Sequence, residues 1–159
     1  MTIRILCVGR IKERFYSDAV AEYCKRLTRY AKVEIVEVDD EKTPERASET
    51  ERRMILDREG ERLLKKIHER DYVVALAIDG KSMDTLGFAT FMGECSQRGL
   101  RACDFVIGGS LGLSEAVLSR ADRKLSFSAM TFPHQLMRVI LVEQIYRAFR
   151  ILAGEPYHK

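Results

Sequence analysis

The stretch of chain that decides the fold is Phe105-Val106-Ile107-Gly108-Gly109-Ser110-Leu111-Gly112-Leu113, followed by Leu125-Ser126-Phe127-Ser128-Ala129-Met130-Thr131-Phe132-Pro133-His134-Gln135. Each half begins as a short apolar strand and runs into a loop of small residues. Such residues allow a ligand to approach the backbone closely. In open α/β sheets, ligands bind beyond the carboxyl ends of the strands. We therefore expect a backbone-lined pocket here, although a Gly-Gly-Ser-x-Gly run fits a plain strand-to-helix turn equally well.

Outward from this stretch, apolar strands and amphipathic helices alternate along the whole chain. Pro44 is a helix-start signal, and the polar run Asp79-Gly80-Lys81 marks the end of a buried strand. The alternation predicts an α/β fold with a mainly parallel sheet and helices on both faces. Strands are expected over 3–8, 33–38, 72–78, 103–107 and 124–127, and helices over 13–27, 46–68, 85–97, 113–120 and 135–152.

Length and composition indicate a single domain over 1–159, since 159 residues contain no repeat and no low-complexity linker. No apolar run approaches the roughly 18 residues of a membrane span, and the N-terminus lacks a signal-peptide core. We expect a cytoplasmic protein without a membrane partner. The four cysteines, Cys7, Cys24, Cys95 and Cys103, lack zinc-ligand spacing. They are interpreted as reduced packing residues, with no metal site.

The net charge is only +3, but its distribution is uneven. From position 120 onward, seven basic residues stand against three acidic ones, Asp122, Glu143 and Glu155. A basic end beside a pocket is typical of a nucleic-acid-binding protein, although many solvated helices also carry arginines. The seven basic residues are Arg120, Arg123, Lys124, Arg138, Arg147, Arg150 and Lys159.

Two common nucleotide-binding motifs are absent. A dinucleotide fingerprint would follow the first strand, but that strand runs into Gly9-Arg10-Ile11-Lys12 without the glycine pattern. No Walker loop occurs either. We therefore expect the pocket to bind a nucleotide-like cofactor by another kind of site, next to a polyanionic substrate.

The last helix is apolar on more than one face, so it is buried or shared with a second subunit. Glu143 and Arg147 are spaced i,i+4, and the sequence alone favours an ordinary surface ion pair over an arginine held for RNA. His134 reads most simply as structural. The tail Tyr157-His158-Lys159 reads as frayed, yet its residue types also suit base stacking and phosphate contact.

Taken together, the motifs resemble the RlmH family of the SPOUT superfamily, ribosomal RNA methyltransferases, from end to end. The resemblance rests on these segments: Val8–Glu13, Glu22–Leu27, Glu59–Glu61, Leu76–Lys81, and the whole of Phe105–Lys159 with Phe132-Pro133-His134-Gln135, Glu143–Ala148 and Pro156-Tyr157-His158. At Leu111 the chain departs from the family pattern, which has a polar residue there.

The resemblance implies a C-terminal trefoil knot that binds S-adenosyl-L-methionine, and a homodimer. It implies methylation of N3 of a pseudouridine in 23S ribosomal RNA within the assembled ribosome, with no role for DNA. We expect so small a protein to recognise a composite ribosomal surface and not free RNA. The positions matching the cofactor site are Leu76, Gly108, Phe127, Ser128, Ala129, Met130, Thr131 and Phe132.

Five residues are hypothesised to act on the substrate. His158 or His134 would assist loss of the N3 proton, because imidazole titrates near neutral pH. Arg147, held by Glu143, would stabilise charge on the uracil carbonyls, and Tyr157 would stack on the extruded base. Two alternatives remain at this stage: a knotted methyltransferase for another RNA such as transfer RNA, and a ribosome assembly factor without cofactor.

Overall fold

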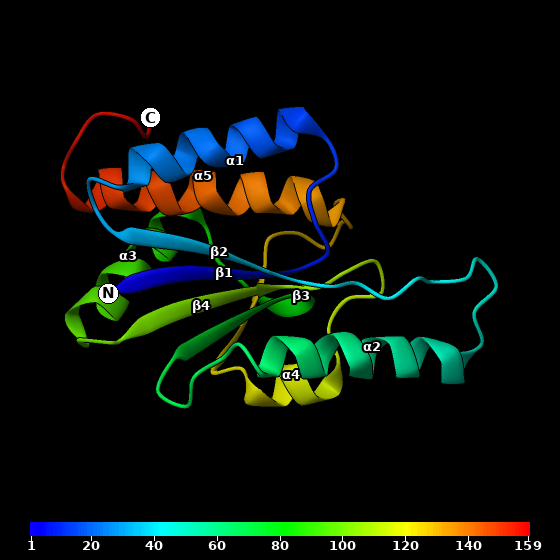
Figure 1. Cartoon of the computed structure of the whole chain (residues 1–159). Coiled ribbons are helices and arrows are strands. Elements are labelled where there is room, and N and C mark those ends of the chain that lie inside the picture. Colours follow the sequence, from blue (N-terminus) through cyan, green and yellow to red (C-terminus); the bar gives the residue numbers. More distant parts are fainter.

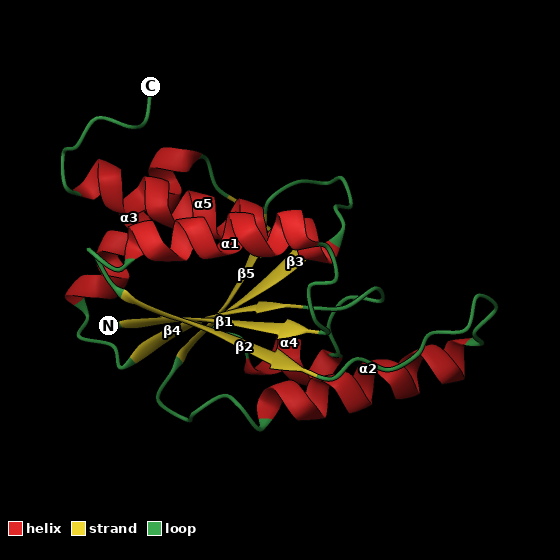
Figure 2. Cartoon of the chain, turned by 45° about the horizontal axis from the view of Figure 1, so that its top comes forward, coloured by secondary structure: helices red, strands yellow, loops and turns green.

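A five-stranded sheet forms the centre of the computed structural model, which describes residues 1–159 (Figures 1 and 2). The strand order is β2-β1-β4-β3-β5, and every pairing is parallel. The predicted α/β class with a mainly parallel sheet is therefore confirmed. The strands are β1 (Thr2–Val8), β2 (Lys32–Val38), β3 (Tyr72–Ser82), β4 (Ala102–Ile107) and β5 (Arg123–Ser126).

Helices cover both faces of this sheet, as Figure 1 shows. On one face lie α1 (Arg14–Leu27), α3 (Thr85–Gln97) and α5 (His134–Leu152), with α5 packed against both others. On the opposite face lie α2 (Glu49–Leu64) and α4 (Glu115–Arg120). None of the helices is both long enough and apolar enough to cross a bilayer. The trefoil knot implied by the resemblance stays a prediction.

Two apolar cores result from this layering. Along β1, Ile3, Ile5 and Cys7 point into the core under α1, α3 and α5, while Leu6 and Val8 point toward α2 and α4. Both faces of the sheet are therefore buried, which explains why the sequences of the strands are continuous apolar runs. All four cysteines are free thiols, and only Cys24 is not fully buried.

The structure corrects the predicted end of β3. The strand continues past Ile78 to Ser82, with a bulge between Leu76 and Lys81 in its pairing with β5. Residues 79–81, expected in a turn, lie in the strand because Lys81 pairs with Leu125 at the edge of the sheet. A side chain at Gly80 would approach the Lys124 carbonyl carbon to 2.8 Å, so only glycine fits this pairing.

The predicted start of α2 is also wrong. Pro44 precedes a loop, and the helix begins at Glu49 after a capping box between Ser48 and Glu51. The Ser48-x-x-Glu51 spacing is itself a helix-start signal. The side chains of Ser48 and Glu51 accept hydrogen bonds from free backbone amides at the start of the helix, which the Pro44 side chain cannot do. The helix ends at Leu64, four residues before the predicted end. Its exposed first turns project beyond the sheet in Figure 2.

Candidate active site

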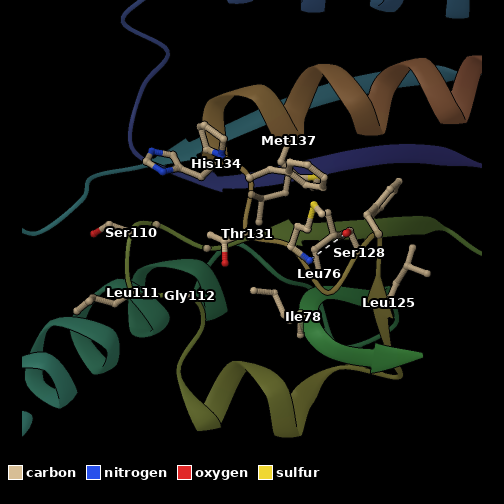
Figure 3. A pocket seen from close by; sticks show the side chains of 18 residues that line it. Leu76, Ile78, Ser110, Leu111, Gly112, Leu125, Ser128, Thr131, His134 and Met137 are labelled. Atoms are coloured by element: carbon tan, nitrogen blue, oxygen red, sulfur yellow. Dashed lines mark hydrogen bonds between the residues drawn. The ribbon is translucent and has the colours of Figure 1, made fainter. Parts of the chain in front are cut away.

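A cavity of about 650 Å³ opens at the carboxyl ends of β3, β4 and β5 (Figure 3). Two of the three loops expected to hold a ligand, those after β4 and β5, contribute to its wall, and so does the start of α5. The third expected loop is part of β3, which lines the cavity with Leu76, Ala77 and Ile78 from within the strand. Ala129 is exposed and does not line the cavity. The residues predicted from the sequence that do line it are Leu76, Gly108, Phe127, Ser128, Met130, Thr131, Phe132 and His134.

The loop after β4 closes tightly on itself. Gly112 donates its N–H to the Gly109 carbonyl at 3.1 Å and has a positive φ of 87°. A Cβ at Gly108 would lie 2.2 Å from the Gly112 carbonyl oxygen. Glycine is therefore required at 108 for the turn to close, and the bare backbone is left to face the cavity.

The loop after β5 is fixed by one serine pair. The Ser126 hydroxyl donates to the Ser128 carbonyl at 3.1 Å, and the Ser128 hydroxyl accepts from the Met130 N–H at 2.9 Å. Figure 3 draws the second of these bonds beside the cavity. The Met130 side chain is 73% exposed, so it is free to cover a bound molecule.

The structure adds wall residues that sequence reasoning missed. Ile78, Leu125 and Met137 make the wall more apolar than small-residue loops alone predict. Met137 follows His134 by one helical turn, so the sequence already indicates that the two side chains lie on the same face of the helix. Leu111, where a polar residue was expected, is also part of the wall. No Asp, Glu, Lys or Arg lines the cavity, so His134 is its one side chain that titrates near neutral pH.

His134 sits at the start of α5 beside several charges. Burial lowers the pKa of His134, the cations Arg138 and Lys12 lower it further, and Asp40 opposes them. The imidazole is therefore neutral at pH 7, the form that can accept a proton.

The other four predicted catalytic residues form a separate cluster. The Glu143 carboxylate accepts from Arg147 Nε and Nη2 at 2.9 and 2.6 Å, and from the Tyr157 hydroxyl at 3.0 Å. Its second oxygen accepts from Gln144 at 2.7 Å. Arg147 Nη1 lies 3.3 Å from His158 Nδ1. Because arginine can only donate, this contact requires the lone pair on Nδ1 and the ring proton on Nε2.

The C-terminal tail is docked and not frayed. The Arg147 guanidinium lies 4.6 Å from the centre of the Tyr157 ring, and Tyr146 packs edge-on at 4.9 Å. Arg150 donates to the Pro156 carbonyl at 2.9 Å. Burial and the Glu143 carboxylate raise the pKa of Tyr157 to about 12, so its hydroxyl remains a donor. For Tyr157 to stack on a base, the ring must first leave Arg147.

This cluster lies away from the cavity within one chain. Arg147 follows His134 by 13 residues on α5, which places it roughly 20 Å along the helix axis. None of the four residues lines the cavity. A second cavity of about 360 Å³ shares Leu125 and Phe127 with the first and is lined by Gln144. The structure thus separates the predicted catalytic residues into His134 at the pocket and four others at the tail.

Four of the seven basic residues at the C-terminal end are held in ion pairs. Arg147 is paired with Glu143, Arg150 with Glu155, and Arg120 with Asp122. Arg138 is buried and bound to Glu37 at 2.7 Å. Three of these partners are the acids already counted against the basic residues, and Arg123, Lys124 and Lys159 form no ion pair, so only Glu37 reduces the positive excess of this end. Its role in binding a nucleic acid stays a prediction.

Comparison with known proteins agrees with this architecture. The family described as "Predicted SPOUT methyltransferase" matches residues 1–158, and the chain belongs to that family. A crystal structure of tRNA (m1G37) methyltransferase from Aquifex aeolicus shares the fold, with a TM-score of 0.58 at 14% identity. The superposition covers 100% of this chain and 75% of that one.

Within the family, the chain belongs to a narrower group of full-length relatives. A protein of Clostridium botulinum (strain Langeland) is 57% identical over 159 residues, and one of Clostridium acetobutylicum is 54% identical. One of Streptococcus thermophilus (strain LMD-9) is 53% identical. Each alignment covers 100% of both chains, and each relative is named ribosomal RNA large subunit methyltransferase H. The recognition of the RlmH family from sequence motifs is confirmed.

Proposed function

We propose that this protein transfers a methyl group from S-adenosyl-L-methionine to N3 of a pseudouridine in 23S ribosomal RNA. Its relatives over the full length are named as methyltransferases of the large ribosomal subunit's RNA. The observation that carries the proposal for this chain is the cavity with a glycine turn at the carboxyl ends of three parallel strands. Action on ribosomes in the cytoplasm follows from the same proposal.

The residues present fit this cofactor. A cavity of about 650 Å³ is in the range of small-molecule sites, and a Cβ at Gly108 would displace the turn that forms its wall. Backbone groups of the loops at 108–112 and 127–132 would hold the nucleoside, and the apolar side chains Leu76 and Ile78 would flank it. When bound, the cofactor supplies an electrophilic methyl group on a sulfonium.

The chain's own contribution is alignment and proton handling. His134 is neutral, half-buried and in the cavity wall, so it is placed to accept the proton that N3 must lose. In the docked tail, the Nδ1 lone pair of His158 faces Arg147. Of the two histidines considered from the sequence, we therefore assign the proton acceptor role to His134.

The decisive experiment is methyl transfer from radiolabelled S-adenosyl-L-methionine to ribosomes from cells lacking this protein, with nucleosides identified by mass spectrometry. Label in N3-methylpseudouridine is expected, with little label on naked ribosomal RNA. Label found only in transfer RNA would move the enzyme to another substrate. Absence of cofactor binding by calorimetry would overturn the enzymatic proposal and favour an assembly factor.

A further inference from the structure

The segment that runs from the end of β1 into the first turn of α1, Gly9–Phe15, contains most of the first family motif but takes no part in the cavity wall. We call this segment the strap. Two contacts hold its backbone against α5: Arg138 Nη2 donates to the Gly9 carbonyl at 2.7 Å, and the Lys12 N–H donates to Gln135 Oε1 at 3.0 Å. Gly9 has a positive φ of 83°, which sets the direction in which the strap leaves the strand. The strap backbone is therefore fixed next to the start of α5.

The strap lies at the mouth of the cofactor cavity. Gln135 directly follows His134, which lines the cavity. In Figure 1 the blue strap rises past the N-terminal end of α5, and in Figure 3 it passes beside His134. An RNA with one nucleotide at the cavity therefore lies within reach of the strap.

Two basic side chains of the strap are free, in contrast to Arg138, Arg147 and Arg150 of α5. Arg10 and Lys12 are exposed, and neither forms an ion pair or a side-chain hydrogen bond. Arg14 has only a loose, fully solvated contact of 3.7 Å with Asp18. The strap carries one acid of its own, the exposed Glu13, and Asp40 lies beside Gly9, but neither pairs with Arg10 or Lys12. The strap thus presents two unpaired cations, Arg10 and Lys12, beside the mouth of the cavity.

An exposed aromatic ring completes the strap. Phe15 is 63% exposed and is the only aromatic among the large apolar residues left on the surface. Its ring forms an edge-to-face pair with Tyr16 at 4.5 Å between ring centres, and most of its surface remains accessible to solvent. Cations beside an aromatic face are the two components with which proteins bind single-stranded nucleic acid.

We propose that the strap binds RNA next to the target nucleotide, with Arg10 and Lys12 on phosphates and Phe15 stacked on an unpaired base. The proposal rests on the proposed function, since it takes the RNA of that reaction as the occupant. Phosphate contacts from rigid backbone positions fix the register of the RNA, whereas the cavity itself has no charge for this purpose.

The test compares Arg10→Ala and Lys12→Ala with two matched controls, Arg70→Ala and Lys65→Ala. Both controls are exposed, unpaired cations in the connection between α2 and β3, near the opposite edge of the sheet. Binding to ribosomes from cells lacking the protein is measured by co-sedimentation over a series of salt concentrations. Each strap variant should reduce the slope of log affinity against log salt by about 0.7–0.9, the value for one lost phosphate contact. The KM for ribosomes should rise in both variants while cofactor affinity stays unchanged, and kcat should stay unchanged in Arg10→Ala, because Lys12 but not Arg10 acts on the pKa of His134.

Phe15→Ala should lower ribosome affinity about tenfold without changing the salt slope, and Phe15→Tyr should restore it. If Phe15→Ala instead changes the oligomeric state, the ring belongs to an interface with a second copy and its stacking role is overturned.

The outcomes distinguish a failure of the strap proposal from a failure of the proposed function. A wild-type protein that methylates ribosomes, together with strap variants that match the controls in slope and KM, overturns the strap and leaves the function intact. A wild-type protein that neither binds nor methylates ribosomes overturns both. Melting temperatures equal to that of the wild type show that the variants are folded.

Discussion

At the scale of single residues, the most unusual environment is that of Asp104 on β4. Its side chain is fully buried and accepts from Arg4 Nη1 at 2.8 Å, and Arg4 also binds Asp71 at 3.0 Å. Burial raises the pKa of Asp104 to about 7, Arg4 lowers it, and the Asp71 carboxylate raises it further. The folded state therefore keeps a proton on Asp104 between about pH 4 and pH 7 that the unfolded chain has lost.

The sign of this shift gives a prediction. A raised carboxyl pKa means that stability is lost as the pH rises through about 7. We expect Asp104→Asn, which mimics the protonated acid, to remove about 1 kcal/mol of the loss in unfolding free energy between pH 6 and pH 8. Urea titrations of both proteins at the two pH values measure the difference. An equal change in unfolding free energy between pH 6 and pH 8 in the two proteins would show that Asp104 is ionised at both pH values.

Gly108 gives the second prediction at this scale. Gly108→Ala places a Cβ 2.2 Å from a backbone oxygen, so the turn must open, at a cost of about 1–3 kcal/mol. We expect cofactor affinity, measured by calorimetry, to fall by at least about tenfold. Gly99→Ala is the control, because an added Cβ at Gly99 meets no neighbour within 4 Å, although its positive φ, which Gly108 lacks, disfavours alanine. That variant should lose some stability and bind cofactor normally. Unchanged affinity in Gly108→Ala would remove this turn from the site.

At the scale of elements, Arg138 connects α5 to the ends of β1 and β2. It is 1% exposed and bonds Glu37 and the Gly9 carbonyl, both at 2.7 Å. Arg138→Met keeps the apolar volume but leaves both partners without a donor. We expect the free energy of unfolding to fall by about 2–3 kcal/mol. This is less than the full cost of breaking a buried ion pair, because the Glu37 side chain is partly exposed. Urea unfolding measures it.

The matched control for this prediction is Arg26→Met, which breaks an exposed i,i+4 pair with Glu22. It should cost no more than about 0.5 kcal/mol. Faster amide exchange at Lys12 in Arg138→Met would accompany the loss, since Arg138 holds the strap at Gly9. Equal losses in the two variants would contradict a special role for Arg138.

The elements also show what the sequence could predict. Every strand and helix was expected, because apolar runs and helical periodicity report burial directly. The end of β3 was wrong because Asp79, Gly80 and Lys81 look like a turn, whereas pairing with β5 keeps them in the strand. Such long-range pairing leaves no trace in a local pattern. The predicted start of α2 was wrong because it rested on Pro44, whereas the helix begins directly after the Ser48 capping box.

At the scale of the whole molecule, the site was only partly predictable. The loops converge on one cavity because the carboxyl ends of parallel strands share an edge of the sheet. The pairing of the basic residues was not predictable: Glu37 and Arg138 are 101 positions apart in the chain. The same holds for the tail, whose docking on Glu143 depends on the tertiary fold.

The separation of the tail cluster from the cavity bears on the predicted homodimer. Arg147 and Tyr157 are tied to Glu143, roughly 20 Å along α5 from His134, so they do not reach the cavity of their own chain while docked. If they act on the substrate, a second copy must bring its tail to the cavity. In a two-fold dimer, each tail would then serve the partner's cavity.

Subunit mixing tests this arrangement. The cofactor concentration is set well below the dissociation constant of Gly108→Ala, so that the cavity of this variant stays empty, and the double variant Arg147→Ala/Tyr157→Ala removes the tail cluster. Each variant alone should then be nearly inactive on ribosomes. Random exchange places one intact cavity opposite one intact tail in half of the dimers. We therefore expect about a quarter of the wild-type sites to recover methyl transfer. Native mass spectrometry verifies that mixed dimers form, and each variant incubated alone is the control. Mixed dimers without recovered activity, a monomeric protein, or a fully active tail variant would each show that the tail does not act across a subunit interface.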